Sequence, residues 1–275
     1  MTEDDTRDFA EFSARLAERA EQLPKRLRQV AQFAREHPDE IALGTAASVA
    51  ENAGVQASTL VRFAKTLGYA GFSDLQQVFL ARLKKRFPDY RQRVALLRAG
   101  PDAESLSGPL LNGFADAATL SVERLRNSID LALVDEAIEL LAGADIIHLV
   151  AARRLFPVTA YLAYAFCNLG QRCALLDHIG QLGREQIGLA GPKDVVLAVS
   201  YAPYAPATID LATLAAQRGN AIIAITDSPS SPLARLSTIR LDVEEADHGA
   251  FRSLAATFAL AMTLAVGTAE RKGRD

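Results

Sequence analysis

The chain has 275 residues, of which 49% are hydrophobic and 23% charged, with a formal net charge of −3. This length suits two domains, and this composition is typical of globular protein with a substantial core, which excludes a disordered chain. No apolar run approaches the roughly 18 to 20 residues that cross a bilayer. The acidic start MTEDDTRDFAEF lacks the apolar segment of a signal peptide. We therefore expect a cytoplasmic protein that does not enter a membrane.

The charges are distributed unevenly along the chain. Residues 54–98 hold nine basic residues against two acidic ones, whereas residues 99–275 hold 14 basic against 20 acidic. A basic segment on an acidic protein favours a polyanion as the partner of that segment, although a solvated helix face gives the same count.

The first 97 residues show apolar residues at helical spacing and no strand pattern. Pro24 can begin a helix that carries Leu27 and Val30, and the pair His37-Pro38 ends it. We expect residues 1–97 to form an all-helical domain.

The stretch TAASVAENAGVQASTLVRFAKTLGYAGF, residues 45–72, has the spacing of a helix-turn-helix motif. Thr45 can cap a first helix that runs through Asn52, and Gly54 permits the left-handed turn after it. Val55 then enters the core, and Leu60, five residues later, faces inward on the second helix.

The second helix of such a motif enters the major groove of double-stranded DNA by its amino-terminal part. Serine and threonine suit phosphate oxygens, and an arginine can bond O6 and N7 of a guanine. A helical hairpin that only packs is the alternative interpretation. The predicted DNA-binding residues are Gln56, Ser58, Thr59, Arg62 and Lys65.

The second half of the chain has a different pattern of apolar residues. Residues 98–113, RAGPDAESLSGPLLNG, contain two Gly-Pro pairs and predict a linker. After residue 130, short apolar runs alternate with helix-like segments, which indicates a parallel sheet buried on both faces. These runs are residues 145–151, 172–177, 194–200, 221–227 and 238–243. We therefore predict an α/β doubly wound domain over residues 114–275.

Two further features of this half leave alternatives open. The last predicted helix, residues 251–267, is apolar on more than one face, so it lies either in the core or at a subunit interface. Cys167 and Cys173 fall in a helix-like and a strand-like run, and we expect buried thiols rather than a disulfide or a metal pair. No Walker loop or zinc-spaced cluster occurs, so we expect no cofactor and no metal.

The motif GVQASTLVRFAKTLGYAGFSDLQ resembles the signature of the RpiR/MurR family of bacterial transcriptional regulators. The stretches DVVLAVSY, RGNAIIAITDSPSSPLA and FRSLAATFALAMTLA are similar to the core strands and last helix of that family. The resemblance implies a helix-turn-helix domain followed by a flavodoxin-like sugar isomerase (SIS) domain that binds phosphosugars at the carboxyl ends of its strands. It also implies a homodimer or a homotetramer.

Two loops depart from the pattern of that family. Its Gly-x-Gly-x-Ser turn after the first strand is replaced by Ala-Ala-Arg-Arg-Leu, residues 151–155. Its phosphate-holding Ser-x-Ser-Gly-x-Thr after the third strand is replaced by Ser-Tyr-Ala-Pro-Tyr-Ala, residues 200–205. Only Ser200 stays in register, and Thr208 can substitute one helical step later. The usual phosphate cradle is therefore largely dismantled.

The replaced residues have several possible roles. Arg153 and Arg154 either clamp an anionic ligand, pair with acids across a subunit interface, or are simply exposed. Tyr201 and Tyr204 either contact a sugar ring or pack under their loop. The predicted effector-binding residues are Arg153, Arg154, Ser200, Tyr201, Tyr204 and Thr208.

SIS folds also host aldose–ketose isomerases, which need a carboxylate or histidine base. The candidates here are Glu245, Asp247 and His248 before the last helix, and Asp177 with His178 after the second strand. An acid-rich loop before a helix is usually a cap. Because a DNA-binding domain is attached and the phosphate loop is lost, we expect no enzyme.

The sequence predicts a DNA-binding regulator that senses a sugar, polyol, sugar acid or phosphosugar and thereby controls operator binding. A DNA-binding protein whose SIS domain serves only oligomerisation is the first alternative. An aldose–ketose isomerase is the second.

Overall fold

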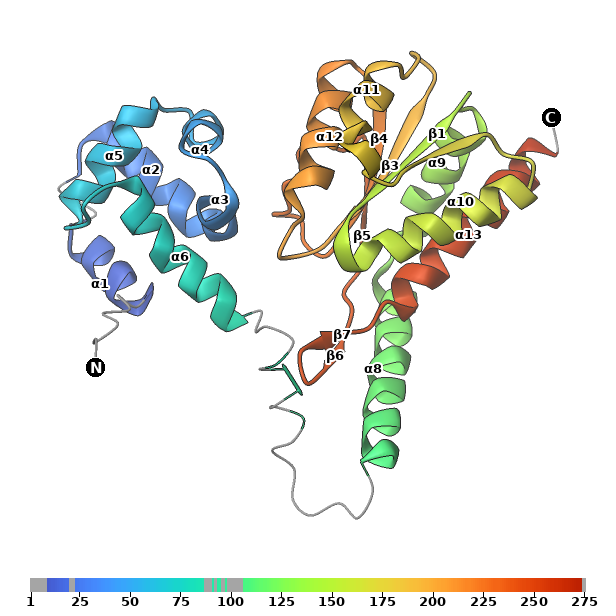
Figure 1. Cartoon of the computed structure of the whole chain (residues 1–275), viewed down its shortest axis with the longest axis horizontal. Helices are drawn as coiled ribbons and strands as arrows, with labels where there is room; N and C mark the ends of the chain where they lie inside the picture. The colour runs from blue at the N-terminus through green and yellow to red at the C-terminus, as the bar shows by residue number, and fades with distance from the viewer. Residues whose placement is uncertain are drawn as a thin grey trace. The chain divides into compact units, whose positions relative to one another are not determined.

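The computed structural model of the chain describes residues 9–19, 23–86, 91, 93, 94, 97 and 106–273. The chain forms two compact units, and the boundary between them falls between Arg93 and Val94. The first unit is helical, and the second is a sheet with helices on both faces (Figure 1). The predicted combination of an all-α domain and a doubly wound α/β domain is therefore confirmed.

Within residues 9–19 and 23–86 of the first unit, six helices share one hydrophobic core. Their bounds are α1 Phe9–Arg19, α2 Lys25–Glu36, α3 Pro38–Leu43, α4 Ala46–Asn52, α5 Ala57–Thr66 and α6 Phe72–Arg86. Pro24 precedes α2 and Pro38 opens α3, as their fixed backbone angle and missing amide predict. The rings of Phe12 and Phe79 meet edge to face with centroids 4.8 Å apart, which joins α1 to α6.

Two glutamine side chains brace the ends of the short helices in this unit. The Nε2 amide of Gln29 on α2 donates to the Ala53 carbonyl, 2.9 Å away, at the end of α4. The Nε2 amide of Gln76 on α6 donates to the carbonyls of Ile41 and Gly44 at the end of α3, at 3.0 and 2.7 Å. Each brace satisfies carbonyls that a helix end would otherwise leave without an intrahelical partner.

The second unit is built on a parallel sheet of five strands in the order β2-β1-β3-β4-β5. Each of the five predicted apolar runs contains one strand, so this prediction is confirmed. The bounds are β1 Ile147–Ala151, β2 Cys173–Leu176, β3 Val195–Ser200, β4 Ala221–Thr226 and β5 Ile239–Asp242. In this order the chain winds away from β1 in both directions, so the topological switch lies between β1 and β3.

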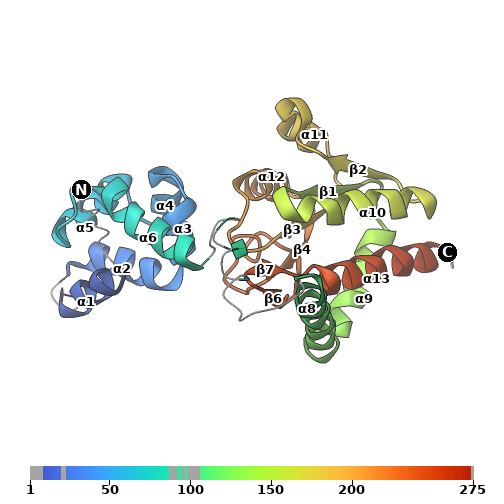
Figure 2. The ribbon, with the colours of Figure 1, turned by 60° about the horizontal axis from the view of Figure 1, so that its bottom comes forward.

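Helices cover both faces of the sheet (Figures 1 and 2). On one face lie α9 Leu131–Ala142, α10 Phe156–Asn168 and α13 Ala255–Lys272, and on the other lie α11 Gly183–Gly188 and α12 Pro206–Gln217. Alternate strand residues feed the two cores, with Leu149 and Leu197 on the α10 side and Val150 and Val196 on the α12 side. Burial on both faces explains why the strands read as continuous apolar runs.

Two predicted boundaries were wrong. Helix α8, Ser107–Ser128, begins inside the predicted linker, and residues 98–105 of that linker lie outside the described residues. Pro109 stands in the first turn of α8, where its missing amide costs no hydrogen bond. The last helix begins at Ala255 rather than 251, because Phe251–Arg252 forms the strand β7 that pairs with β6, Asp247–His248.

The expectation of two buried thiols was also wrong for one of them. Cys167 is exposed, and Cys173 is half-buried. Helix α10 places Cys167 in its last turn on the outer face, where Tyr161 and Tyr164 are also exposed. Among the described helices, none is long and apolar enough to span a membrane.

A buried carboxylate ties together the edges of β1 and β3. The side chain of Asp194 is 4% exposed and accepts hydrogen bonds from the amides of Ile146 and Gly191 and from Nε2 of His148, 2.9 Å away. Burial opposes ionisation of Asp194, but the hydrogen bonds from His148 and the two amides outweigh it and lower its pKa. The ionised carboxylate therefore stabilises the folded sheet.

Asp194→Asn is expected to lower the free energy of unfolding above pH 5 and to lower it less at more acidic pH. The pKa of Asp194 is lower in the folded chain than the ordinary value of about 3.9, so its contribution is present above that value and is lost as pH falls through the folded pKa. Urea unfolding followed by circular dichroism from pH 6 to pH 3 measures the difference. The exposed Asp135→Asn is the matched control, and a constant difference at all pH values would contradict the prediction.

Candidate functional site

The helix-turn-helix motif forms as its sequence predicts. The Thr45 hydroxyl accepts a hydrogen bond from the Ser48 amide, and the Ser48 hydroxyl accepts one from the Thr45 amide, which together cap α4. Gly54 follows α4 with φ +64°, a left-handed conformation that favours glycine. The Val55 amide then donates to the Ala50 carbonyl at 2.9 Å, which turns the chain into α5.

Helix α5 has one buried and one exposed face. Leu60, Phe63 and Ala64 have no exposed area and fix the helix in the core. The five predicted DNA-binding residues share the outer side: Gln56, Ser58, Arg62 and Lys65 are exposed and Thr59 is half-buried. Val61 is also exposed, at 38%, and sequence reasoning missed it. An apolar side chain there can contact the methyl group of a thymine.

Two hollows beside α5 extend this surface onto α2. Their cavity volumes are about 850 and 360 Å³, and Thr59 and Arg26 line both. Lys25 lines the larger hollow together with Arg62. Sequence reasoning missed Lys25 and Arg26 because only the fold brings residues 25–26 beside α5. The cluster PKRLR at residues 24–28 was the available signal.

In the second unit, the turn after β1 holds the two arginines in different directions. Arg153 is exposed and has φ +58°, although a residue with a side chain rarely adopts a left-handed backbone. It occupies the position of the second glycine in the Gly-x-Gly-x-Ser pattern. Arg154 is half-buried, and its Nη2 donates to the Ala202 carbonyl in the loop after β3. One arginine is therefore held in a strained conformation, and the other braces a neighbouring loop.

The loop after β3 uses its own polar groups. The Ser200 hydroxyl accepts a hydrogen bond from the Ala205 amide at 3.4 Å, and the Ala202 amide donates to Asp227 at 3.1 Å. The peptide bond between Ala202 and Pro203 is cis. The Ser200 hydroxyl is therefore engaged within this loop, and the Ala202 amide is engaged by Asp227, which follows β4.

The remaining predicted effector residues on this side are buried. Tyr201 is 1% exposed, and its hydroxyl lies 2.6 Å from the Thr257 hydroxyl, which in turn donates to Glu245. Burial, with the carboxylates of Glu245 and Asp227 nearby, holds the pKa of Tyr201 above its usual value. Tyr204 is also buried, which agrees with the alternative that both tyrosines pack under the loop.

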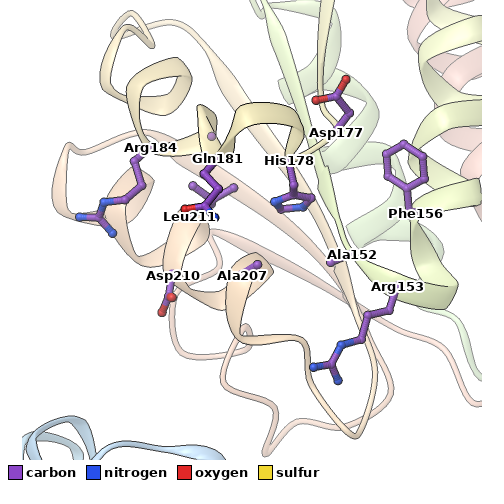
Figure 3. Close-up of a pocket in the computed structure, with 11 residues that line it drawn as sticks. Ala152, Arg153, Phe156, Asp177, His178, Gln181, Arg184, Ala207, Asp210 and Leu211 are labelled. Carbon is purple, nitrogen blue, oxygen red and sulfur yellow. The ribbon is translucent and has the colours of Figure 1, made fainter.

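A cavity of about 710 Å³ opens at the carboxyl ends of β1 and β2, beside the start of α12 (Figure 3). Figure 3 shows His178 and Gln181 above Ala152 and Ala207, and the guanidinium of Arg153 below them. Of the six predicted effector residues, Arg153 lines this cavity, whereas the described lining does not include Arg154, Ser200, Tyr201, Tyr204 or Thr208. Thr208 is fully buried, and its hydroxyl has no hydrogen-bond partner among the described residues.

The lining of the cavity is charged and mixed in sign. Arg153 and Arg184 supply guanidinium groups, and Asp177 and Asp210 supply carboxylates. The Nε2 of His178 lies 3.0 Å from the Ala151 carbonyl, to which it donates. A cavity of this size, lined by both donors and acceptors, can hold a small molecule that carries hydroxyls and one acidic group.

The candidate isomerase bases are separated in space. Glu245 accepts hydrogen bonds from the amide and hydroxyl of Thr257, both at 2.7 Å, so it caps α13. The ring of His248 packs against Phe114 on α8, with centroids 5.2 Å apart. Asp177, whose carboxylate accepts from the Ile179 amide, and His178 do line the cavity.

Both units match known protein families. Residues 11–85 match the model of the helix-turn-helix domain of the rpiR family, and residues 140–267 match that of the SIS domain. The chain is thus a protein in which a helix-turn-helix domain precedes a SIS domain. Its first domain is of the rpiR family of helix-turn-helix domains, and its second is a SIS domain.

The chain is also similar to curated relatives and to solved structures. The chain is 29% identical over 221 residues to the bifunctional protein glk of Burkholderia orbicola, a match that covers 80% of this chain and 33% of that protein. The chain thus spans about a third of the length of the curated relatives it matches.

Two solved structures have a similar fold. The NanR protein of Vibrio vulnificus, complexed with ManNAc-6P, is 23% identical with a TM-score of 0.62, over 95% of this chain and 92% of that one. The sugar isomerase domain of an RpiR transcription factor from Sphaerobacter thermophilus is 24% identical with a TM-score of 0.56, over 60% of this chain and 91% of that one.

Proposed function

We propose that the protein is a transcriptional regulator that binds a double-stranded operator through α5 and releases or tightens it when a sugar-related metabolite occupies the SIS domain. One observation carries this proposal: an exposed, polar recognition helix and a charged cavity at the carboxyl ends of β1 and β2 occur in one chain. A protein whose helical unit served only as packing, or one that served only as an enzyme, would not need both an exposed polar helix and this cavity.

The effector is an anionic sugar derivative, either a phosphosugar or a sugar acid. The exposed guanidinium of Arg153 bonds the acidic group in place of the missing hydroxyl cradle, because a guanidinium matches a phosphate or a carboxylate with two parallel hydrogen bonds. Asp177 and Asp210 accept hydrogen bonds from the sugar hydroxyls. The bound ManNAc-6P of the similar NanR protein supports this ligand class.

The protein acts as a homodimer or a homotetramer, so that two α5 helices read a two-fold related operator with half-sites about 34 Å apart. Tyr161 and Tyr164 on α10, 43% and 65% exposed, and Val266 on α13, 44% exposed, supply apolar surface for pairing of SIS domains. The two helices lie side by side (Figure 2). Sedimentation equilibrium of the full chain measures the state directly.

An architectural protein whose SIS domain only oligomerises is the second candidate. The observation that favours it is the loop after β3, in which the hydroxyl of Ser200 is already engaged and the tyrosines are buried. This candidate predicts operator affinity that no metabolite changes.

The experiment combines operator selection with a ligand screen. Genomic fragments captured by the full-length protein give the operator, and fluorescence anisotropy gives its affinity with and without each ligand. The ligands are sugars and polyols paired with their phosphates and acids. A true effector at about a hundred times its dissociation constant should stabilise the protein by roughly 2.7 kcal/mol, which a melting curve resolves.

The outcomes separate the candidates. An anionic sugar that raises the melting temperature and changes operator affinity supports the proposal. Stabilisation by neutral sugars alone would contradict the role of Arg153 as the partner of an anionic group. A screen without any response would favour the architectural protein. Chemical conversion of a ligand during incubation would indicate an isomerase instead.

A further inference from the structure

The two cysteines of the chain lie against each other at the far end of α10. Cys167 is in the last turn of α10, Cys173 is the first residue of β2, and their sulfur atoms are 3.8 Å apart. The turn between them is ordered by backbone hydrogen bonds, since the amide of Gly170 donates to the carbonyl of Cys167 and that of Gln171 to Phe166. The short distance therefore belongs to a fixed turn.

The two thiols differ in access to solvent. Cys167 is exposed, whereas Cys173 is half-buried with its sulfur 3.7 Å from the Ala163 carbonyl. Burial, together with the adjacent Cys167, raises the pKa of Cys173 to about 12. An oxidant from solution therefore meets Cys167 first, and Cys173 stands directly behind it.

We propose that Cys167 and Cys173 form an oxidation site that closes to an intramolecular disulfide when the protein meets a hydroperoxide. The Cys167 thiolate attacks one peroxide oxygen, the O–O bond breaks, and a sulfenic acid and hydroxide form. The Cys173 sulfur then attacks the Cys167 sulfur, the S–O bond breaks, and the leaving hydroxide takes up the Cys173 proton as water. Two thiols are oxidised by two electrons, and the peroxide is reduced.

The movement this step needs is small. A disulfide holds its sulfur atoms about 2.05 Å apart, so the present separation of 3.8 Å closes by less than a bond length plus a rotation of the exposed Cys167 side chain. A sulfenic acid next to a second thiol is the arrangement in which oxidation stops at the disulfide instead of running on to irreversible acids.

The cysteine pair lies on two elements, α10 and β2, that also carry residues of the cavity. Helix α10 begins at Phe156 and β2 leads to Asp177, and both of these residues line the cavity. Their opposite ends meet at the cysteines, so the disulfide joins two elements that both contribute lining residues to the cavity. The chemistry itself does not depend on the proposed function.

Peptide mapping tests the proposal on the full-length protein. Trypsin cuts after Arg154, Arg172 and Arg184, which puts Cys167 in peptide 155–172 and Cys173 in peptide 173–184. After hydrogen peroxide and alkylation of remaining thiols, we expect the two peptides joined, two mass units lighter than their sum, and separated by a reductant. Because the chain has only two cysteines, the assignment is unambiguous.

Two variants complete the test. Cys173→Ser should leave a sulfenic acid on Cys167 that dimedone traps, and Cys167→Ser should leave Cys173 at least tenfold slower to react. Reduced variants with the melting curve of the parent chain exclude a folding defect. Any of three results would overturn the proposal. The two peptides could stay separate after peroxide, Cys167 of the parent chain could carry a sulfinic acid, or peptide 155–172 could be joined to a second copy of itself.

Discussion

Arg153→Gly is expected to abolish the response to an anionic effector while raising the free energy of unfolding. The guanidinium that lines the cavity is lost, so the ligand loses its charged partner. The left-handed backbone at φ +58° becomes free of strain, because glycine has no side chain to crowd it. Since that strain costs roughly 1–2 kcal/mol and glycine is more flexible when unfolded, the net gain is up to about 1 kcal/mol. Effector titration and urea unfolding measure the two effects.

Arg153→Ala is the matched control for this prediction. It removes the same guanidinium but keeps a side chain at the strained position, so the response should disappear without any gain in stability. Operator affinity in the absence of effector should stay unchanged in both variants. A full effector response in Arg153→Gly would assign Arg153 to another role, such as an ion pair at a subunit interface.

Arg62→Ala is expected to weaken operator binding by about 1–3 kcal/mol, or roughly 5- to 150-fold, and to relax the preference for one base. Arg62 is exposed on α5 beside the larger hollow, so its guanidinium is available to a guanine edge. Anisotropy titrations against the operator and against single-base variants of it measure affinity and specificity together.

Two further substitutions separate base reading from charge. Lys65→Ala should weaken binding to all sequences alike and reduce the slope of log affinity against log salt by about one, as for a phosphate contact. Arg35→Ala removes an exposed arginine from the last turn of α2 and should change neither quantity. Arg62→Ala with unchanged affinity and base preference would remove Arg62 from the reading surface.

The fold could be predicted from the sequence where local chemistry decides it. Gly54 and the cap at Thr45 specify the helix-turn-helix, and continuous apolar runs specify strands buried on both faces. The boundaries failed where two local signals compete. Gly108 and Pro109 are typical of a turn, yet proline is equally at home in the first turn of a helix, and α8 uses it there.

The candidate site was harder to predict because its residues converge only in three dimensions. Neighbouring Arg153 and Arg154 look equivalent in the sequence. Because the backbone at Arg153 is left-handed, Arg153 lines the cavity, whereas Arg154 donates to the Ala202 carbonyl. The burial of Tyr201 depends on Thr257 in a distant helix. Lys25 joins the surface around α5 only through the packing of α2 against α5.

The glutamine braces of the first unit bear on how a signal can reach DNA. Gln29 and Gln76 clamp α4 and α3 to the longer helices, and a single apolar core runs beneath all six. A helical unit built this way resists internal bending, so in the proposed dimer an effector would have to act on the distance and angle between two such units. If base pairs are inserted between the half-sites of the operator, the change in affinity that the effector causes should then rise and fall with the helical repeat of DNA.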